Sequence, residues 1–295
     1  MRDEGARVGV LVVHGIGEQS EEEFGVTFIA EVRRRLAGRG VADGDVAFRR
    51  GYWADLLKPR EAALLAAAER AGTLRWRELR GFVVNALADA VAYRRASADE
   101  ANMYYAVHAR ILAHLRALRE TLGHDAPLVV VAHSLGSVIA SDFVWDAQHP
   151  ERGCGVAAEA AGGTDFERAR TLAGLVMLGS TLPLFTLALP RVLAVAPPRA
   201  SPALSPAVRA AAEWHNYYDP DDVLGWPLRE QDPGGPLGPG EWAYRDAVDA
   251  DHAVEVGTLV TGWNPLSHTG YWKSDRVLDA AADQIAAVAR AAGEG

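Results

Sequence analysis

Residues 127–137, with the sequence PLVVVAHSLGS, constrain the fold of this chain more than any other segment. The apolar, valine-rich run predicts a buried strand, and the pattern after Gly136 predicts a helix. Ser134 lies at the sharp turn between them. Such a turn holds a serine in a strained backbone conformation and presents its hydroxyl at the carboxyl edge of a sheet. Strand and helix pack closely there, so small residues are needed two before and two after the serine, and Ala132 and Gly136 satisfy this need. We therefore predict that Ser134 is a nucleophile.

A second turn rich in glycine, HGIG at residues 14–17, follows another predicted buried strand at residues 8–13. Glycine lets the backbone turn sharply and expose its amide groups. Acyl transfer needs two such amides aimed at the oxyanion that develops on the attacked carbonyl. We expect one amide from Leu135 and the other from Ile16 or Gly17. The alternative, a phosphate-binding loop, is less consistent with the sequence because HGIG has neither the GxxxxGK[ST] nor the GxGxxG spacing.

Candidates for an acid and a histidine follow the serine, in the chain order that this type of turn requires. Residues 214–225 read as an aromatic strand that ends in three aspartates at a turn. Asp222 is favoured as the acid because an aliphatic and small sequence follows it, and Asp221 is the alternative. Asp219 precedes a proline and is expected to shape the turn. His268 lies in a loop ahead of a predicted helix and is the candidate base.

A serine hydroxyl is a weak nucleophile at neutral pH and needs such a base. In this interpretation His268 takes the proton of Ser134 and returns it to the leaving group, while the aspartate orients the imidazole. We assign His14, Gly15 and His133 to the substrate-binding surroundings. His133 is expected to point away from the nucleophile, and His14 is expected to hydrogen-bond beneath the site.

The remaining histidines are interpreted as packed or solvated residues: His108, His114, His124, His149, His215 and His252. The last of these belongs to an acidic stretch, residues 249–252. Two aspartates and one histidine without a partner cluster do not make a metal site, so this stretch is interpreted as a surface loop. We predict no metal and no organic cofactor.

With these residues in view, the chain resembles the α/β-hydrolase superfamily, and more narrowly its serine esterase and lipase branch. Residues 12–19, VVHGIGEQ, resemble the oxyanion strand of a bacterial hydrolase group. Residues 216–226, NYYDPDDVLGW, are similar to the acid-bearing segment of DDHD-type phospholipases, and residues 267–272, SHTGYW, resemble their histidine segment. The resemblance assigns the acid to Asp222. Asp219 stands where those phospholipases tend to carry histidine, so their substrate is not transferred to this chain.

At 295 residues the chain is long enough for one large α/β domain with excursions. Its net charge of −9 argues against nucleic-acid binding and against non-specific attraction to anionic membranes. The single cysteine, Cys154, excludes an internal disulfide, and the acidic start of the chain does not resemble a signal peptide. The most apolar segment, residues 172–189, is interrupted by glycine and proline, so no transmembrane span is expected. We expect a cytoplasmic enzyme and make no prediction of its oligomeric state.

The predicted fold is a single α/β-hydrolase domain over residues 1–295, with a mostly parallel central sheet flanked by helices. Residues 56–122 are expected to form a helical insertion. Residues 181–210, apolar and interrupted by prolines, are expected to form a lid, with a packed surface loop as the alternative. Within the insertion, Trp76 is surrounded by three arginines: Arg75, Arg77 and Arg80. This basic and aromatic cluster either gives peripheral contact with phospholipid headgroups or is a solvated helix face.

The function expected from these features is hydrolysis of carboxylic esters through an acyl-enzyme on Ser134. The apolar lid favours acyl or lipid-like esters. Two alternatives stay open: an acyltransferase with the same triad, or a module of this fold that binds a ligand or partner without turnover. The presence of Ser134, Asp222 and His268 argues against the second alternative.

Overall fold

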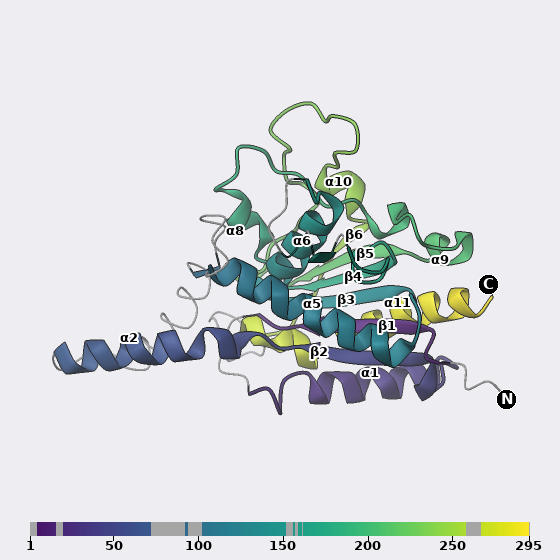
Figure 1. The fold of residues 1–295 in the computed structure, drawn as a ribbon, viewed down its shortest axis with the longest axis horizontal. Helices are drawn as coiled ribbons and strands as arrows, with labels where there is room; N and C mark the ends of the chain where they lie inside the picture. Colours follow the sequence, from purple (N-terminus) through teal and green to yellow (C-terminus); the bar gives the residue numbers. More distant parts are fainter. Residues whose placement is uncertain are drawn as a thin grey trace.

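The computed structural model describes residues 5–15, 20–71, 92–93, 102–151, 156, 159–160, 162–257 and 267–294. At its centre is a six-stranded sheet in the order β2-β1-β3-β4-β5-β6, with every pair of neighbouring strands parallel (Figure 1). The strands are β1 (Val8–Val13), β2 (Val46–Gly51), β3 (Leu128–His133), β4 (Leu172–Leu178), β5 (Glu213–Tyr218) and β6 (Ala250–Ala253).

Helices connect and cover these strands. The α-helices are α1 (Val26–Gly38), α2 (Lys58–Ala71), α5 (Met103–Leu122), α6 (Leu135–Gln148), α8 (Leu182–Thr186), α9 (Pro206–Ala210), α10 (Tyr244–Ala247) and α11 (Asp275–Gly293). The 3₁₀ helices are η1 (Asp43–Asp45), η2 (Ala54–Leu56), η4 (Pro198–Ala200) and η5 (Ser267–Lys273).

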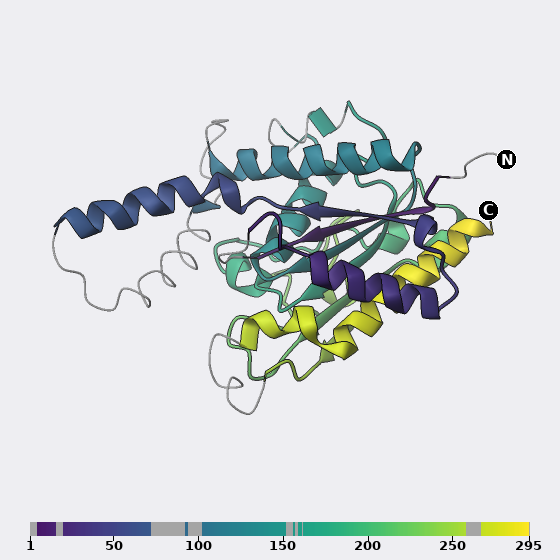
Figure 2. The same ribbon diagram turned by 90° about the horizontal axis from the view of Figure 1, so that it is seen from below.

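The sheet is buried on both faces. Successive side chains of a strand point to opposite faces, so a strand covered on both sides reads as a continuous apolar run. In β1, Val8, Val10 and Val12 pack in one buried cluster with residues of α1 and α11. Leu11 and Val13 pack in another cluster with residues of α5 and α6. Figure 2 shows the two resulting layers, with α5 on one side of the sheet and α1 and α11 on the other.

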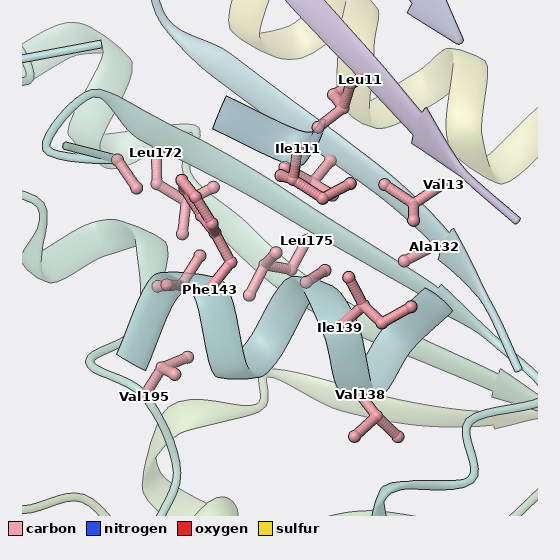
Figure 3. Packing of buried hydrophobic residues seen from close by; sticks show 14 of the residues in the cluster. Leu11, Val13, Ile111, Ala132, Val138, Ile139, Phe143, Leu172, Leu175 and Val195 are labelled. Carbon is pink, nitrogen blue, oxygen red and sulfur yellow. The ribbon is translucent and has the colours of Figure 1, made fainter. Parts of the chain in front are cut away.

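The layer of α5 and α6 forms the larger buried cluster. Figure 3 shows Ile111 of α5 close to Leu11 of β1, and Phe143 and Ile139 of α6 facing the sheet near Leu175 of β4. These side chains are all but fully buried. Such packing holds α6 tightly against β3 and β4, and therefore fixes the position of the turn from which α6 starts.

Because the strands are parallel, the segments that follow them leave the sheet at the same edge. The turn at His14 follows β1, Ser134 follows β3, and the aspartate-rich segment follows β5. The 3₁₀ helix η5, which begins just before His268, precedes α11. Its Trp272 packs edge-on against Phe28 of α1, with ring centroids 5.0 Å apart, and so anchors η5 to the body of the protein.

The prediction of an α/β fold with a parallel sheet flanked by helices is confirmed at this level of detail. Within the predicted insertion, the helix α5, which lies between β2 and β3 in the chain, packs on the sheet and belongs to its helical layer. By contrast, α2 projects away from the sheet (Figures 1 and 2). The cluster around Trp76 and the single Cys154 lie outside the described residues.

The interpretation of residues 249–252 as a surface loop was wrong. Ala250–Ala253 form β6, which pairs with the end of β5 at the edge of the sheet. Asp251 accepts hydrogen bonds from the backbone amides of Leu228 and Arg229, and Asp249 accepts one from the amide of Trp214. The acidic residues of this stretch therefore hold neighbouring backbone in place.

The predicted lid, residues 181–210, contains α8, η4 and α9. Its first turn is anchored, because Leu182 and Pro183 are buried, whereas Leu187 is 82% exposed. The lid role itself stays a prediction. Within the described part of the chain, none of the helices has the length and apolar character needed to cross a membrane.

Candidate active site

Ser134 has a backbone conformation that side chains rarely adopt. Its φ is 54° and its ψ is −128°, and Ala169 is the only other described residue besides glycine with a positive φ. Such a conformation costs roughly 1–3 kcal/mol and persists only where its surroundings enforce it. Here the amide of Ser134 donates to Leu178 O (2.9 Å), and the amide of Ser137 donates to Ser134 O (2.9 Å). The turn is thus tied to β4 on one side and to α6 on the other, as expected for a strained turn between strand and helix.

Two glycines allow other backbone segments to approach this turn. A Cβ at Gly136 would collide with the backbone carbonyl of His14. The close contact between α6 and the end of β1 is therefore the reason why a small residue is needed after the serine. A Cβ at Gly15 would collide with the side chain of Ser134. Glycine at both positions therefore leaves room for the serine side chain and for the segment that follows β1.

The structure brings Ser134, His268 and Asp222 together. Nε2 of His268 lies 2.7 Å from Ser134 Oγ, and its Nδ1 lies 2.7 Å from Asp222 Oδ2. All three are buried, with exposed fractions of 0%, 4% and 4% for the serine, histidine and aspartate. An ionised carboxylate only accepts, so Nδ1–H donates to Asp222, and Nε2 is left to accept the serine proton. This is the arrangement in which a histidine can act as general base toward a serine.

Asp222, rather than the alternative Asp221, contacts the histidine. Burial opposes its ionisation, but hydrogen bonds from His268, from the amide of Leu224 and from the hydroxyl of Tyr271 outweigh burial and hold the pKa of the carboxyl below its usual value. Asp221 is exposed, and its amide donates to Asp219 Oδ1 (2.9 Å).

Asp219 shapes the loop as expected, and its carboxylate also accepts hydrogen bonds from residues outside its own turn. Besides the bond to Asp221, its Oδ2 accepts from the amides of Val256 (2.7 Å) and Gly257 (3.2 Å). It therefore connects the loop after β5 with the segment after β6.

His133 lies beneath His268 and not beside the serine hydroxyl. The two rings are 4.8 Å apart between centroids, and Nε2–H of His133 donates to the backbone carbonyl of His268 (2.7 Å). Burial lowers the pKa of His133 to about 3, so its ring is neutral near pH 7. His133 therefore supports the backbone of the histidine segment from inside the protein.

His14 is also buried. Its ring stacks on Trp53 at 4.9 Å between centroids, and its Nε2 accepts from the amide of Trp53 (3.2 Å). Burial lowers the pKa of His14 to about 4. This agrees with hydrogen bonding beneath the site. Contact of His14, Gly15 and His133 with a substrate stays a prediction.

Of the expected oxyanion donors, Leu135 is described, whereas Ile16 and Gly17 lie outside the described residues. Leu135 is the first residue of α6, so its N–H has no partner within the helix and lies at the positive end of the helix dipole. An N–H at this position, one residue after the serine, can stabilise negative charge that develops next to Ser134 Oγ.

Two contacts of the site were not anticipated. The hydroxyl of Ser137 bonds to Ser134 O (2.6 Å) and lies 2.8 Å from Ser180 Oγ, which links the turn to the end of β4. The hydroxyl of Tyr271 donates to Asp222. Tyr271 stands three residues after the candidate base, in the segment SHTGYW, and only this proximity in the sequence could have drawn attention to it.

No protein-family model matches this chain, and no curated protein matches its sequence. In the described residues, no group of three or more His, Cys, Asp or Glu side chains could hold a metal ion. What can be inferred about chemistry therefore comes from the geometry of the three residues at the sheet edge.

Proposed function

We propose that this protein is a serine hydrolase that cleaves carboxylic esters through an acyl-enzyme on Ser134. The observation that carries the proposal is the pair of 2.7 Å hydrogen bonds that joins Ser134 Oγ, the ring of His268 and Asp222 Oδ2 at a strained turn. A buried serine hydroxyl hydrogen-bonded to a histidine, itself oriented by a carboxylate, is the arrangement that activates serine for acyl transfer.

In the first half of the reaction, Oγ of Ser134 attacks the ester carbonyl while its proton passes to Nε2 of His268. The negative oxygen of the tetrahedral intermediate is stabilised by the N–H of Leu135 and by a second amide, for which the sequence favours Ile16 or Gly17. His268 then gives the proton to the departing alkoxide, which leaves as an alcohol. Asp222 stays ionised throughout and stabilises the imidazolium.

In the second half, a water molecule gives a proton to His268 and attacks the acyl carbonyl. The bond between acyl carbon and Oγ breaks, the carboxylic acid leaves, and Ser134 recovers its proton from His268. No external oxidant, reductant or metal enters these steps.

The same features support assignment to the α/β-hydrolase class, as one domain. The serine lies at a strand-turn-helix junction of a parallel sheet, and the acid and the histidine follow it along the chain in that order. The segments similar to DDHD-type phospholipases, residues 216–226 and 267–272, carry Asp222 and His268 respectively.

We further propose that the substrates are acyl or lipid-like esters. Large apolar side chains are exposed on the segment that follows β4 and on the segment that follows β5 and carries Asp222: Leu184, Leu187, Leu189, Val223 and Trp226. Apolar side chains on such segments can contact an acyl chain. The same exposed side chains could contact a lipid surface peripherally, and such contact needs no transmembrane segment.

The test is reaction with a fluorophosphonate, followed by intact-protein mass spectrometry, on wild type and on Ser134→Ala. Attack of Oγ on phosphorus expels fluoride and leaves one covalent adduct, so we expect a single adduct on wild type and none on the variant. A folded wild-type protein that gains no adduct at neutral pH would contradict the proposal and favour a binding module. A panel of p-nitrophenyl esters of increasing acyl length then tests the substrate class.

An acyltransferase with the same residues would form the same adduct. Addition of an alcohol or thiol acceptor to an ester reaction separates the two activities, because hydrolysis gives a free acid and transfer gives a new ester or thioester. For a hydrolase we expect free acid to be the main product at every acceptor concentration tested.

A further inference from the structure

The hydroxyl of Tyr271 is a buried connection between the two loops that carry the proposed triad acid and base. It accepts a hydrogen bond from the amide of Asp219 (2.8 Å) and lies 2.9 Å from Asp222 Oδ2. Because the amide N–H occupies the hydroxyl oxygen as an acceptor, the hydroxyl proton is left to donate to the carboxylate. Tyr271 is completely buried, so water does not compete for this proton.

The space around this hydroxyl depends on two glycines from neighbouring loops. A Cβ at Gly225 would lie 2.5 Å from Asp222 Oδ2 and 2.8 Å from the hydroxyl oxygen of Tyr271. A Cβ at Gly179, after β4, would lie 2.6 Å from Cε2 of the same ring. Gly225 and Gly179 therefore form a slot that admits the tyrosine ring and lets its hydroxyl reach the acid.

The carboxylate is held at both oxygens. Oδ1 of Asp222 accepts from the amide of Leu224 (3.0 Å), while Oδ2 accepts from both the Tyr271 hydroxyl and Nδ1 of His268. The tyrosine therefore shares the oxygen that faces the histidine. Donation to that oxygen fixes the rotation of the carboxyl group and takes up part of the negative charge that would otherwise act on His268 alone.

We propose that Tyr271 is a positioning residue for the acid, and that its hydroxyl both orients Asp222 toward His268 and moderates the charge that the histidine meets. This inference rests on the proposed function only for its effect on catalysis, because the hydrogen bonds exist in the protein without substrate. Tyr271 does not touch the reacting atoms and acts through Asp222.

The titratable groups that the described residues place against Asp222 and His268 are Asp219, His133 and Tyr271, with His14 further along the sheet edge. Burial raises the pKa of Tyr271 far above its usual value, so its proton stays in place at neutral pH. Burial lowers the pKa of His133 to about 3, so that ring stays neutral. Neither of these groups therefore changes charge between pH 5 and pH 9.

The experiment compares Tyr271→Phe with Tyr217→Phe. Tyr217 lies on β5, two residues before Asp219, and its ring stacks on that of His252 in β6. Its variant therefore removes the hydroxyl of another buried tyrosine, while the hydroxyl that donates to Asp222 stays in place. The second-order rate of fluorophosphonate labelling is measured from pH 5 to pH 9 for both variants and for wild type.

Without the tyrosine hydroxyl, the Asp222 carboxylate acts more strongly on the imidazolium of His268, so protonated histidine persists to higher pH. For Tyr271→Phe we expect the midpoint of the acid limb to rise by about 0.5–1 pH unit and the plateau rate to fall about 3- to 10-fold. For Tyr217→Phe we expect the wild-type midpoint and plateau.

A second readout makes the test independent of reactivity. The ring nitrogens of His268 are followed by NMR through a pH titration of wild type and Tyr271→Phe, and we expect the titration of the variant to move to higher pH. If wild type gains no adduct, the proposed function fails, and this titration still decides the role of Tyr271. Unchanged midpoints in Tyr271→Phe, with only a lower melting temperature, would overturn the inference and leave the hydroxyl with a purely structural role.

Discussion

Nε2–H of His133 donates to the backbone carbonyl of His268 across 2.7 Å, so the residue that precedes the proposed nucleophile supports the residue that would activate it. The contact joins the end of β3 to η5, through two residues that are 135 positions apart in the chain. The ring of His133 is fully enclosed at this contact, and burial lowers its pKa to about 3 even though the hydrogen bond to the carbonyl acts in the opposite direction. Because His133 is buried with a lowered pKa, we expect the stability of the fold to depend on pH in the acid range.

We expect the free energy of unfolding to decrease as the pH falls below about 6.5. In the unfolded chain His133 and His14 bind protons below that pH, whereas burial lowers the folded pKa values to about 3 and about 4, respectively. The unfolded state thus binds more protons, and each ring contributes a loss of about 1.4 kcal/mol per pH unit down to its folded pKa. Urea unfolding at pH 5 and pH 6.5 measures the loss. His133→Asn should show a smaller slope, and equal stability of wild type at the two pH values would contradict the expectation.

The choice between neighbouring aspartates is tested by Asp222→Asn beside Asp221→Asn. The asparagine at position 222 can donate its amide to Nδ1 of His268 and so favour the wrong tautomer, for which we expect labelling by a fluorophosphonate to slow about 10³- to 10⁴-fold. Asp221 is exposed and does not contact His268, so its variant should react at the wild-type rate. Comparable losses in both variants would remove Asp222 from its proposed role.

Gly15→Ala tests whether the segment after β1 must approach the serine. The added methyl group would collide with the side chain of Ser134 and with the carbonyl of His133, so we expect reaction with a fluorophosphonate to fall at least about 10-fold while the far-ultraviolet spectrum stays that of wild type. Gly38→Ala, at the end of α1, is the matched control because a Cβ there meets nothing within 4 Å. A Gly15→Ala protein as reactive as the control would show that the predicted collision does not matter.

The strain at the turn is measured by Ser134→Gly against Ser134→Ala. Both variants lose the hydroxyl, so they differ by one buried methyl group at a position whose backbone conformation favours glycine. Glycine adopts a φ of 54° without steric cost, and we expect it to be more stable than alanine by about 1 kcal/mol after the greater entropy of unfolded glycine is subtracted. Chemical denaturation gives the two values. A more stable alanine variant would mean that the serine is not held under strain.

Patterns within short stretches of sequence predicted two buried strands and the turn at Ser134. The buried strands at residues 8–13 and 127–133 and the turn at Ser134 follow from apolar runs that end abruptly at small or polar residues. The strand β6 escaped prediction because its four residues, ADHA, have no apolar alternation, and pairing with β5 alone makes them a strand. The helical insertion predicted for residues 56–122 contains α5, but the sequence of this region does not say which of its helices covers the sheet and which extends from it.

The sequence by itself determined which residue types could form a serine, histidine and aspartate set and in which order they occur, because strand, turn and helix signals near each of them are short in range. The sequence favoured Asp222 over Asp221, and the tertiary structure places its carboxylate against His268. The tertiary structure alone decided that His133 supports the histidine backbone and that Tyr271 donates to the acid. These contacts join residues 46, 135 and 49 positions apart. Such contacts arise when a parallel sheet gathers the loops that follow its strands at one edge, and no pattern within a single segment records which side chains will meet there.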